Sequence, residues 1–259
     1  MSAPLVSRPA PHEQVRWLPR QHGAWAMLAV PFLLGIAASR PSAWQLLLAL
    51  TAVSGYLASG AVLDWTRARR AAYGPPALVF GTLFALSGVL LLVAFPALLP
   101  VAAVVGAAAA LVLGVTVAGH PRSLLASLGQ ASEAVVLVPA AALVSGAPVW
   151  LPVARATLVA GLYLVSSILV VRSMIRERGH RDFAALSLGY HVGAVALEAW
   201  LLAPAYAALA AAFLLRAATL PWLQARLASG PRHLRPIHVG LVELATAVAL
   251  VLVAFCVRF

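Results

Sequence analysis

The chain has 259 residues, of which 63% are hydrophobic and only 10% are charged, and its mean hydropathy is +0.97. Soluble domains carry about 25% charged residues, so the composition excludes a soluble domain and predicts an integral membrane protein. The formal net charge is +11, and every basic residue is an arginine. In a membrane protein these charges belong to loops beside the bilayer, and no nucleic-acid partner is expected. The single cysteine, Cys256, excludes an intrachain disulfide and thiolate metal clusters.

The apolar segments predict one all-α domain over residues 23–259, preceded by a polar cytoplasmic tail over residues 1–22. A helix needs about 20 residues to cross the bilayer, and prolines mark several places where one span ends and the next begins. A cleaved signal sequence at residues 23–39 is the less favoured alternative, because a long polar tail precedes it. Nine transmembrane helices are therefore predicted, at 23–39, 43–63, 76–95, 97–118, 123–146, 149–171, 183–202, 204–224 and 238–257.

The arginines fix the predicted orientation. With a cytoplasmic N-terminus, most of them fall in loops on the cytoplasmic face, whereas Arg40, Arg155 and Arg258 lie on or near the other face. Positively charged loops remain in the cytoplasm during membrane insertion. We therefore expect a multi-pass protein of the bacterial cytoplasmic membrane, with its C-terminus outside and membrane lipids as its surroundings.

Three cytoplasmic segments carry candidate binding residues. His22 lies beside Trp25 at the start of the first span, either as part of an interfacial anchor or at the mouth of a pocket. Asp64 precedes Arg67 and Arg70, either as an ion pair within one helix or as part of a site. His120 and Arg122 lead into the fifth span.

Arg172 and Arg176 share one helix face at the end of the sixth span. Two interpretations are open for this pair. Arginines near a span end often anchor a helix and contact anionic lipid. Alternatively, their planar guanidinium groups form a clamp for phosphate or carboxylate.

Other candidates lie within the predicted spans. Gln130 and Glu133 fall in the fifth, Arg216 is near the middle of the eighth, and His191 is one heptad before Glu198. Charges at this depth are rare and mark functional sites or structural ion pairs. Arg216 is expected to pair with Glu133 or Glu198. Arg235 precedes the last span, where Glu243 belongs either to a tightly packed helix start or to the same cavity.

Two segments carry resemblances to known families. RQHGAWAMLAVP at 20–31, together with RPIHVGLVE at 235–243, resembles the YwiC-like family of bacterial membrane proteins, which has no assigned activity. HPRSLLASLGQASE at 120–133 distantly resembles the UbiA-type intramembrane prenyltransferases. That second resemblance implies a nine-helix, UbiA-like bundle with active-site loops after helices two and six.

The UbiA-type enzymes hold magnesium and a prenyl diphosphate with two aspartate-rich motifs, which this chain lacks. Its matching loops offer Asp64 in one, and Glu177 with Asp182 in the other. Magnesium is therefore not supported, and no cofactor is predicted. If the chain is an enzyme, the resemblance implies a prenyltransferase-like transferase with an altered active site.

The leading hypothesis is a protein that binds an isoprenoid, quinone-like or anionic lipid in a cytoplasm-facing cavity. In that hypothesis the arginines replace the metal bridge, at positions 67, 70, 172 and 176. The alternative is a small-anion or proton-coupled transporter that uses Glu133, Glu198 and Arg216. A haem protein using His22, His120 or His191 is less favoured, because axial ligands have to come from facing helices.

Overall fold

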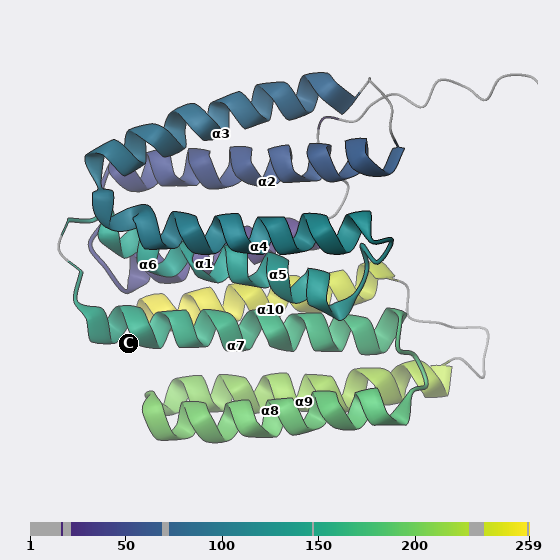
Figure 1. Ribbon diagram of the computed structural model, residues 1–259. Helices are drawn as coiled ribbons and strands as arrows, with labels where there is room; N and C mark the ends of the chain where they lie inside the picture. The colour runs from purple at the N-terminus through teal and green to yellow at the C-terminus, as the bar shows by residue number, and fades with distance from the viewer. Residues whose placement is uncertain (1–16, 18–21, 69–72, 147, 228–235, 258) are drawn as a thin grey trace, which may run out of the picture.

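The computed structural model describes residues 17, 22–68, 73–146, 148–227, 236–257 and 259, and within them every regular element is a helix. Figure 1 shows these helices running roughly parallel or antiparallel in one bundle. In chain order they are α1 (His22–Ala37), α2 (Trp44–Ala68), α3 (Gly74–Ala94), the 3₁₀ helix η2 (Pro96–Leu98), α4 (Leu99–Val117), α5 (Leu124–Val135), α6 (Leu137–Leu143), α7 (Trp150–Ile175), α8 (Arg181–Leu201), α9 (Pro204–Leu227) and α10 (Pro236–Cys256).

Eight segments of the described chain are long and apolar enough to cross a membrane. They correspond to eight of the nine predicted spans, and η2 with α4 forms one of them. The remaining helix, α1, has 16 residues, and its apolar part, Trp25–Ala37, is shorter than a standard crossing. The multi-pass helical architecture is therefore confirmed, whereas the count of nine spans is not.

The span over Leu124–Leu143 is divided into α5 and α6 at Val136. Pro139 explains the division, because proline has no N–H to donate to the carbonyl four residues earlier. That carbonyl belongs to Val135, the last residue of α5. The helix direction is retained, and α5 with α6 remains a single candidate span.

Helix α1 occupies the interior of the bundle, where it packs against α5, α6, α7 and α10. Its side chain Leu34 is fully buried in the core shared by these helices. A Cβ atom on Gly35 would lie 2.7 Å from the Cβ of Ala141 and 2.9 Å from the carbonyl oxygen of Val138. Glycine at this position therefore allows α1 and α6 to approach closely.

Two helical hairpins flank this interior. Figure 1 shows α2 with α3 on one side of the bundle and α8 with α9 on the other. Most of the α3 surface is exposed, including the apolar residues Leu78, Leu86 and Val93. An apolar surface of this kind suits contact with lipid rather than with water.

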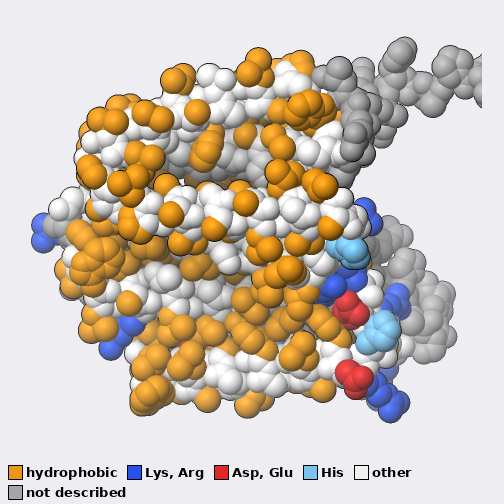
Figure 2. Space-filling model, viewed as in Figure 1, with side chains coloured by type: hydrophobic (Ala, Val, Ile, Leu, Met, Phe, Trp, Pro, Cys, Tyr) orange, Lys and Arg blue, Asp and Glu red, His pale blue; other side chains and the backbone are white. Residues whose placement is uncertain are grey.

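Charged side chains gather at one end of the bundle. Figure 2 shows blue, red and pale-blue side chains at the right end of the face in view, fewer blue ones at the left end, and an orange surface between them. The loops over residues 119–123 and 176–180 lie at the charged end, and Phe259 lies at the opposite end (Figure 1). We call the end with these two loops the basic end.

Candidate functional site

The loop over residues 119–123 at the basic end has a defined backbone. Gly119 adopts a φ of 86°, and the N–H groups of Gly119 and His120 donate to the carbonyls of Thr116 and Val115 over 3.0 Å each. This is the Schellman arrangement that ends an α-helix, and its left-handed position suits glycine. Four residues later, the Ser123 hydroxyl accepts from the N–H of Ala126 over 3.1 Å and caps α5.

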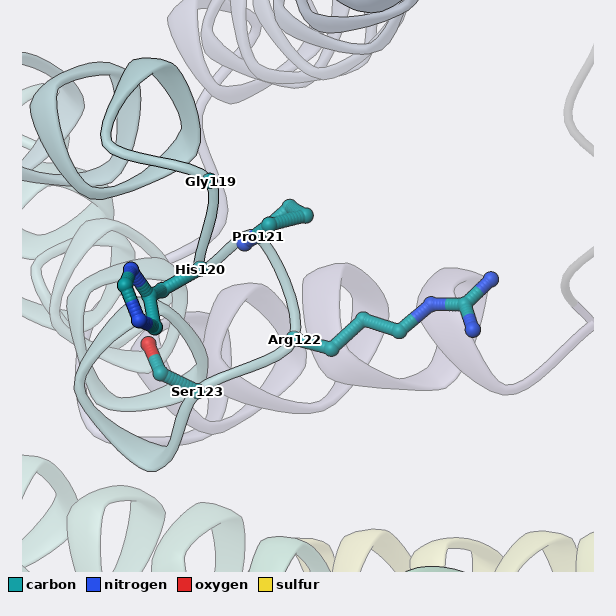
Figure 3. Close-up of a pocket in the computed structure, with 5 residues that line it drawn as sticks. All are labelled: Gly119, His120, Pro121, Arg122 and Ser123. Atoms are coloured by element: carbon teal, nitrogen blue, oxygen red, sulfur yellow. The ribbon is translucent and has the colours of Figure 1, made fainter.

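A surface hollow is lined by this loop, from Gly119 to Ser123. Figure 3 shows the His120 ring and the Ser123 hydroxyl close together, whereas the Arg122 side chain extends away from them. A ring nitrogen of His120 also contacts the carbonyl oxygen of Ala118 over 2.9 Å. The loop is therefore held at both of its ends, and the Arg122 side chain projects outward.

Two arginines from α7 and its C-terminal end meet on this loop. Arg172 and Arg176 each donate through Nη1 to the carbonyl oxygen of Arg122, over 2.9 and 2.8 Å. Arg172 also pairs with Glu177 over 3.0 Å, and Glu177 lies 3.4 Å from His180. The Nε atom of Arg172 is buried and has no hydrogen-bond partner among the described residues. We call Arg122, Arg172 and Arg176 the arginine cluster.

The arginine cluster carries excess positive charge, because Glu177 pairs with Arg172 while Arg122 and Arg176 have no ion pair among the described residues. Partial burial lowers the pKa of Arg176 below its ordinary value, and repulsion from Arg172 and Arg122 lowers it further, against the opposing effect of Glu177. Like charges held together in this way favour the binding of an anion. Guanidinium forks match phosphate and carboxylate geometry.

Arg216 lies deep in the bundle and pairs with Glu243 of α10 over 2.8 Å. The prediction that Glu133 or Glu198 would be its partner was wrong. Helices α9 and α10 pack against each other, and their rotation brings both side chains into the interior, where each residue is less than a tenth exposed. The guanidinium of Arg216 also lies over the ring of Phe213, 5.1 Å from its centroid.

Hydroxyl groups complete this buried ion pair. Ser167 donates to the second carboxylate oxygen of Glu243 over 2.5 Å, while Arg216 donates to Ser166 over 2.8 Å and to Thr246 over 3.0 Å. These hydroxyls were not predicted as functional residues. The adjacent pair Ser166–Ser167 inside an apolar span was the one available signal.

His191 of α8 joins the same network. Its Nε2 lies 2.7 Å from the Ser166 hydroxyl, and its Nδ1 lies 2.6 Å from the carbonyl oxygen of Ser187. A carbonyl only accepts, so Nδ1 carries the proton. His191 and Glu198 are both buried on one face of α8, as their spacing predicts, but Glu198 lies near the helix end and has no hydrogen bond or ion pair among the described residues.

Two predicted site residues on helix α5 lie outside both the arginine cluster and the hydrogen-bonded network of Arg216 and Glu243. Gln130 is exposed, and Glu133 is partly buried. Across the described chain, neither side chain has a hydrogen bond or an ion pair. The predicted set of Glu133, Glu198 and Arg216 is therefore not brought together.

Five predicted residues remain to be placed. Asp64 is exposed near the end of α2. Arg70 and Arg235 lie outside the described residues, as do the side chains of His22 and Arg67. In the part of the chain that the structure describes, no group of three or more His, Cys, Asp or Glu residues is placed to hold a metal ion.

Comparison with known proteins gives one family match. Residues 18–142 match the protein family described as YwiC-like protein. Over 41 residues the chain is 51% identical to a Bacillus subtilis (strain 168) protein named "Uncharacterized protein YwiC", and this stretch covers 16% of the chain and 17% of that protein. No solved structure matches. The family match includes α1–α5, most of α6 and the loop over residues 119–123, and it ends before Arg172.

Proposed function

We propose that the chain is a YwiC-like, multi-pass membrane protein that binds the anionic headgroup of a lipid-like ligand at the arginine cluster. One observation carries the proposal: Arg172 and Arg176 converge on the carbonyl oxygen of Arg122 beside the hollow lined by residues 119–123. The carbonyl carries no formal charge, and the nearby carboxylate of Glu177 pairs with Arg172 and leaves Arg176 without an ion pair among the described residues. A phosphate in the hollow would supply both the missing negative charge and further acceptor oxygens.

Exposed apolar side chains beside the cluster support a ligand with a hydrocarbon tail. Leu125 in the first turn of α5 is 50% exposed, and Ile175 at the end of α7 is 52% exposed. An amphiphile could place its headgroup on the arginines and its tail along these residues within the bilayer. This arrangement favours an isoprenoid phosphate or an anionic phospholipid over a neutral quinone, which lacks the charge that the arginines require.

The basic end is proposed to face the cytoplasm. It holds Arg122, Arg172, Arg176, Arg178 and Arg181, whereas the described arginines away from it and outside the core are few. The excess of positive charge at one end follows the bias of cytoplasmic loops in membrane proteins. The protein would then lie in the bacterial cytoplasmic membrane with its C-terminus outside.

The proposal covers binding and no transfer reaction. Magnesium-dependent prenyl transfer requires carboxylates that present free oxygens to the metal. Glu177, the acidic residue closest to the arginine cluster, is already bound to Arg172 and lies beside His180. Transport through Glu133, Glu198 and Arg216 lacks support for a related reason, because Arg216 is bound to Glu243.

A binding experiment tests the proposal. The full-length protein in phosphatidylcholine nanodiscs is titrated with a polyprenyl monophosphate, with phosphatidic acid and with inorganic phosphate. Arg176→Gln removes one charge-assisted hydrogen bond, so binding of the two amphiphiles is expected to weaken about 10- to 100-fold. The three probes also separate the ligand sources, because a site for free phosphate would bind inorganic phosphate as tightly as the amphiphiles.

Arg178→Gln is the matched control. Arg178 is exposed in the same loop and makes no contact with the carbonyl of Arg122. Equal losses in the two variants would mean that net charge alone attracts the ligand. Unchanged binding in Arg176→Gln would overturn the proposed site.

A further inference from the structure

Polar residues follow one side of α5 from the basic end towards the middle of the bundle. Ser123, Ser127, Gln130 and Glu133 are separated by four, three and three residues. Residues at this spacing lie near one face of an α-helix, one above the other. We call these four residues the α5 stripe. It begins at the loop that lines the hollow and ends at a carboxyl group inside the span Leu124–Leu143.

The two halves of the α5 stripe differ in hydrogen bonding. Ser123 accepts from the backbone of Ala126, and Ser127 donates to the carbonyl of Ser123 over 3.2 Å. Gln130 and Glu133 have no such partners in the described residues. Glu133 is the tenth residue of a 20-residue span, which places it about 15 Å from the helix start at 1.5 Å per residue.

The helices packed against α5 offer Glu133 little compensation. They are α1, α4, α6 and α7. Neither α4 nor α6 contains a titratable residue, and the one in α1 is His22, whose side chain lies outside the described residues. Helix α7 has Tyr163 in its middle, buried against Phe213, and Arg155 and Arg172 towards its two ends.

Glu243 shows how this fold stabilises an ionised carboxylate at depth. It has an arginine at 2.8 Å and a serine hydroxyl at 2.5 Å. Within the described part of the chain, Glu133 contacts neither an arginine nor a serine hydroxyl, yet part of its surface is accessible. An ionised carboxylate without a partner is costly in an apolar layer, whereas a protonated carboxyl group is tolerated far better.

We propose that Glu133 is a proton-binding site within the membrane, and that the α5 stripe connects it to the basic end. A proton from water at that end binds to a carboxylate oxygen of Glu133, which removes the negative charge and forms an O–H group. Gln130, exposed one turn closer to the loop, provides both donors and acceptors along the way. This site is independent of the anion bound by the arginine cluster.

Infrared difference spectroscopy on the full-length protein in nanodiscs tests the site. Moving from alkaline to acidic buffer should produce the C=O band of a protonated carboxyl group. Glu133→Gln has nearly the same shape and should lose that band, whereas Glu198→Gln should retain it. An acid-induced band that survives in Glu133→Gln and disappears in Glu198→Gln would overturn the proposal.

Chemical labelling gives a second measurement that needs no variant. Dicyclohexylcarbodiimide is apolar and reacts with protonated carboxyl groups. The carboxyl O–H adds across a C=N bond of the carbodiimide, and the resulting adduct rearranges to a stable acylurea. Peptide mass spectrometry should find the adduct on Glu133 in acidic buffer, with less in alkaline buffer, and none on Glu243. An unmodified Glu133 in acidic buffer would contradict the proposal.

The connection to the basic end is tested by the rate of exchange. After transfer into heavy water, the Glu133 band shifts as its proton is replaced by deuterium, and Gln130→Leu should slow this shift several-fold. Ser132→Ala is the matched control, because Ser132 lies on another side of α5 and bonds to the carbonyl of Leu128 within its own helix. Equal exchange rates in the two variants would remove the proposed path.

Discussion

Replacing Glu243 by leucine would leave Arg216 charged and buried without its carboxylate. Arg216 is 6% exposed, and its guanidinium would retain only the hydroxyls of Ser166 and Thr246 and the ring of Phe213. Ser167 would also lose its acceptor. The substitution therefore removes the carboxylate that pairs with Arg216 while leaving the positive charge in place.

The expected loss of stability is about 3 kcal/mol. Breaking one half of a buried ion pair typically costs 3–5 kcal/mol, and an arginine at the centre of a membrane helix costs about 2.5–3.5 kcal/mol on insertion scales. The lower part of the range applies here because the hydroxyls keep some of the hydrogen bonds. The unfolding equilibrium should then shift roughly 100-fold.

Titration with sodium dodecyl sulfate in mixed detergent micelles unfolds the protein and measures this difference in stability. The control is Thr246→Val, which removes a neutral hydroxyl from the same network. Hydrogen bonds between membrane helices average about 0.6 kcal/mol, so this control should cost far less than Glu243→Leu.

The double variant Arg216→Met, Glu243→Leu provides the decisive comparison. Replacing both partners removes the uncompensated charge, so the double variant should be more stable than either single variant. The reasoning would be refuted if Glu243→Leu cost less than about 1 kcal/mol, or if the losses in the two single variants simply added.

Three further predictions test the packing, the histidine and the orientation. Gly35→Ala should destabilise the protein by about 1–3 kcal/mol, because the added Cβ meets Ala141 and the Val138 backbone. Gly106→Ala is the control, because a Cβ there has open space, and equal stability of the two variants would contradict the prediction. In the same assay, His191→Leu should lower the free energy of unfolding by about 1–2 kcal/mol, because it removes the hydrogen bonds to Ser166 and Ser187. An unchanged free energy of unfolding would exclude a stabilising role for His191. In a Cys256→Ser background, His180→Cys should react with an impermeant maleimide only in inverted vesicles and Ser42→Cys only in intact cells, and the reverse pattern would invert the proposed orientation.

Hydropathy alone located the helices well. Each predicted span overlaps one helix or one broken helix of the structure, because long apolar runs have few alternatives in a bilayer. The length of α1 was less predictable, since an apolar run continues to Ala38 while the helix ends at Ala37, and its first side chains are not described. Pro139 could have predicted the division between α5 and α6, because its missing N–H is visible in the sequence.

The partner of Arg216 could not be predicted in the same way. Sequence spacing determines which residues share a helix face, but the rotation of one helix against another depends on the packing of all their side chains. His191 and Glu198 therefore share the buried face that their spacing predicts, whereas the predicted partners of Arg216 were Glu133 and Glu198 and the observed one is Glu243. The arginine cluster could be predicted only in part. The sequence identified Arg172 and Arg176 as neighbours on one helix face, but it could not show that both donate to the backbone carbonyl of Arg122.

Pairing, rather than depth, distinguishes the roles of the intramembrane charges. Arg216 and Glu243 lie deep but satisfy each other, and the hydroxyls around them belong to the neighbouring helix α7 and to α10, which is what a structural ion pair requires. Glu133 also lies in the middle of a span, but it has no partner in the described residues and remains partly accessible. A carboxylate that only stabilises the fold does not need access to protons from outside the bundle. The difference between the two carboxyl groups therefore predicts that Glu243 governs stability and that Glu133→Gln leaves stability nearly unchanged while it removes proton binding.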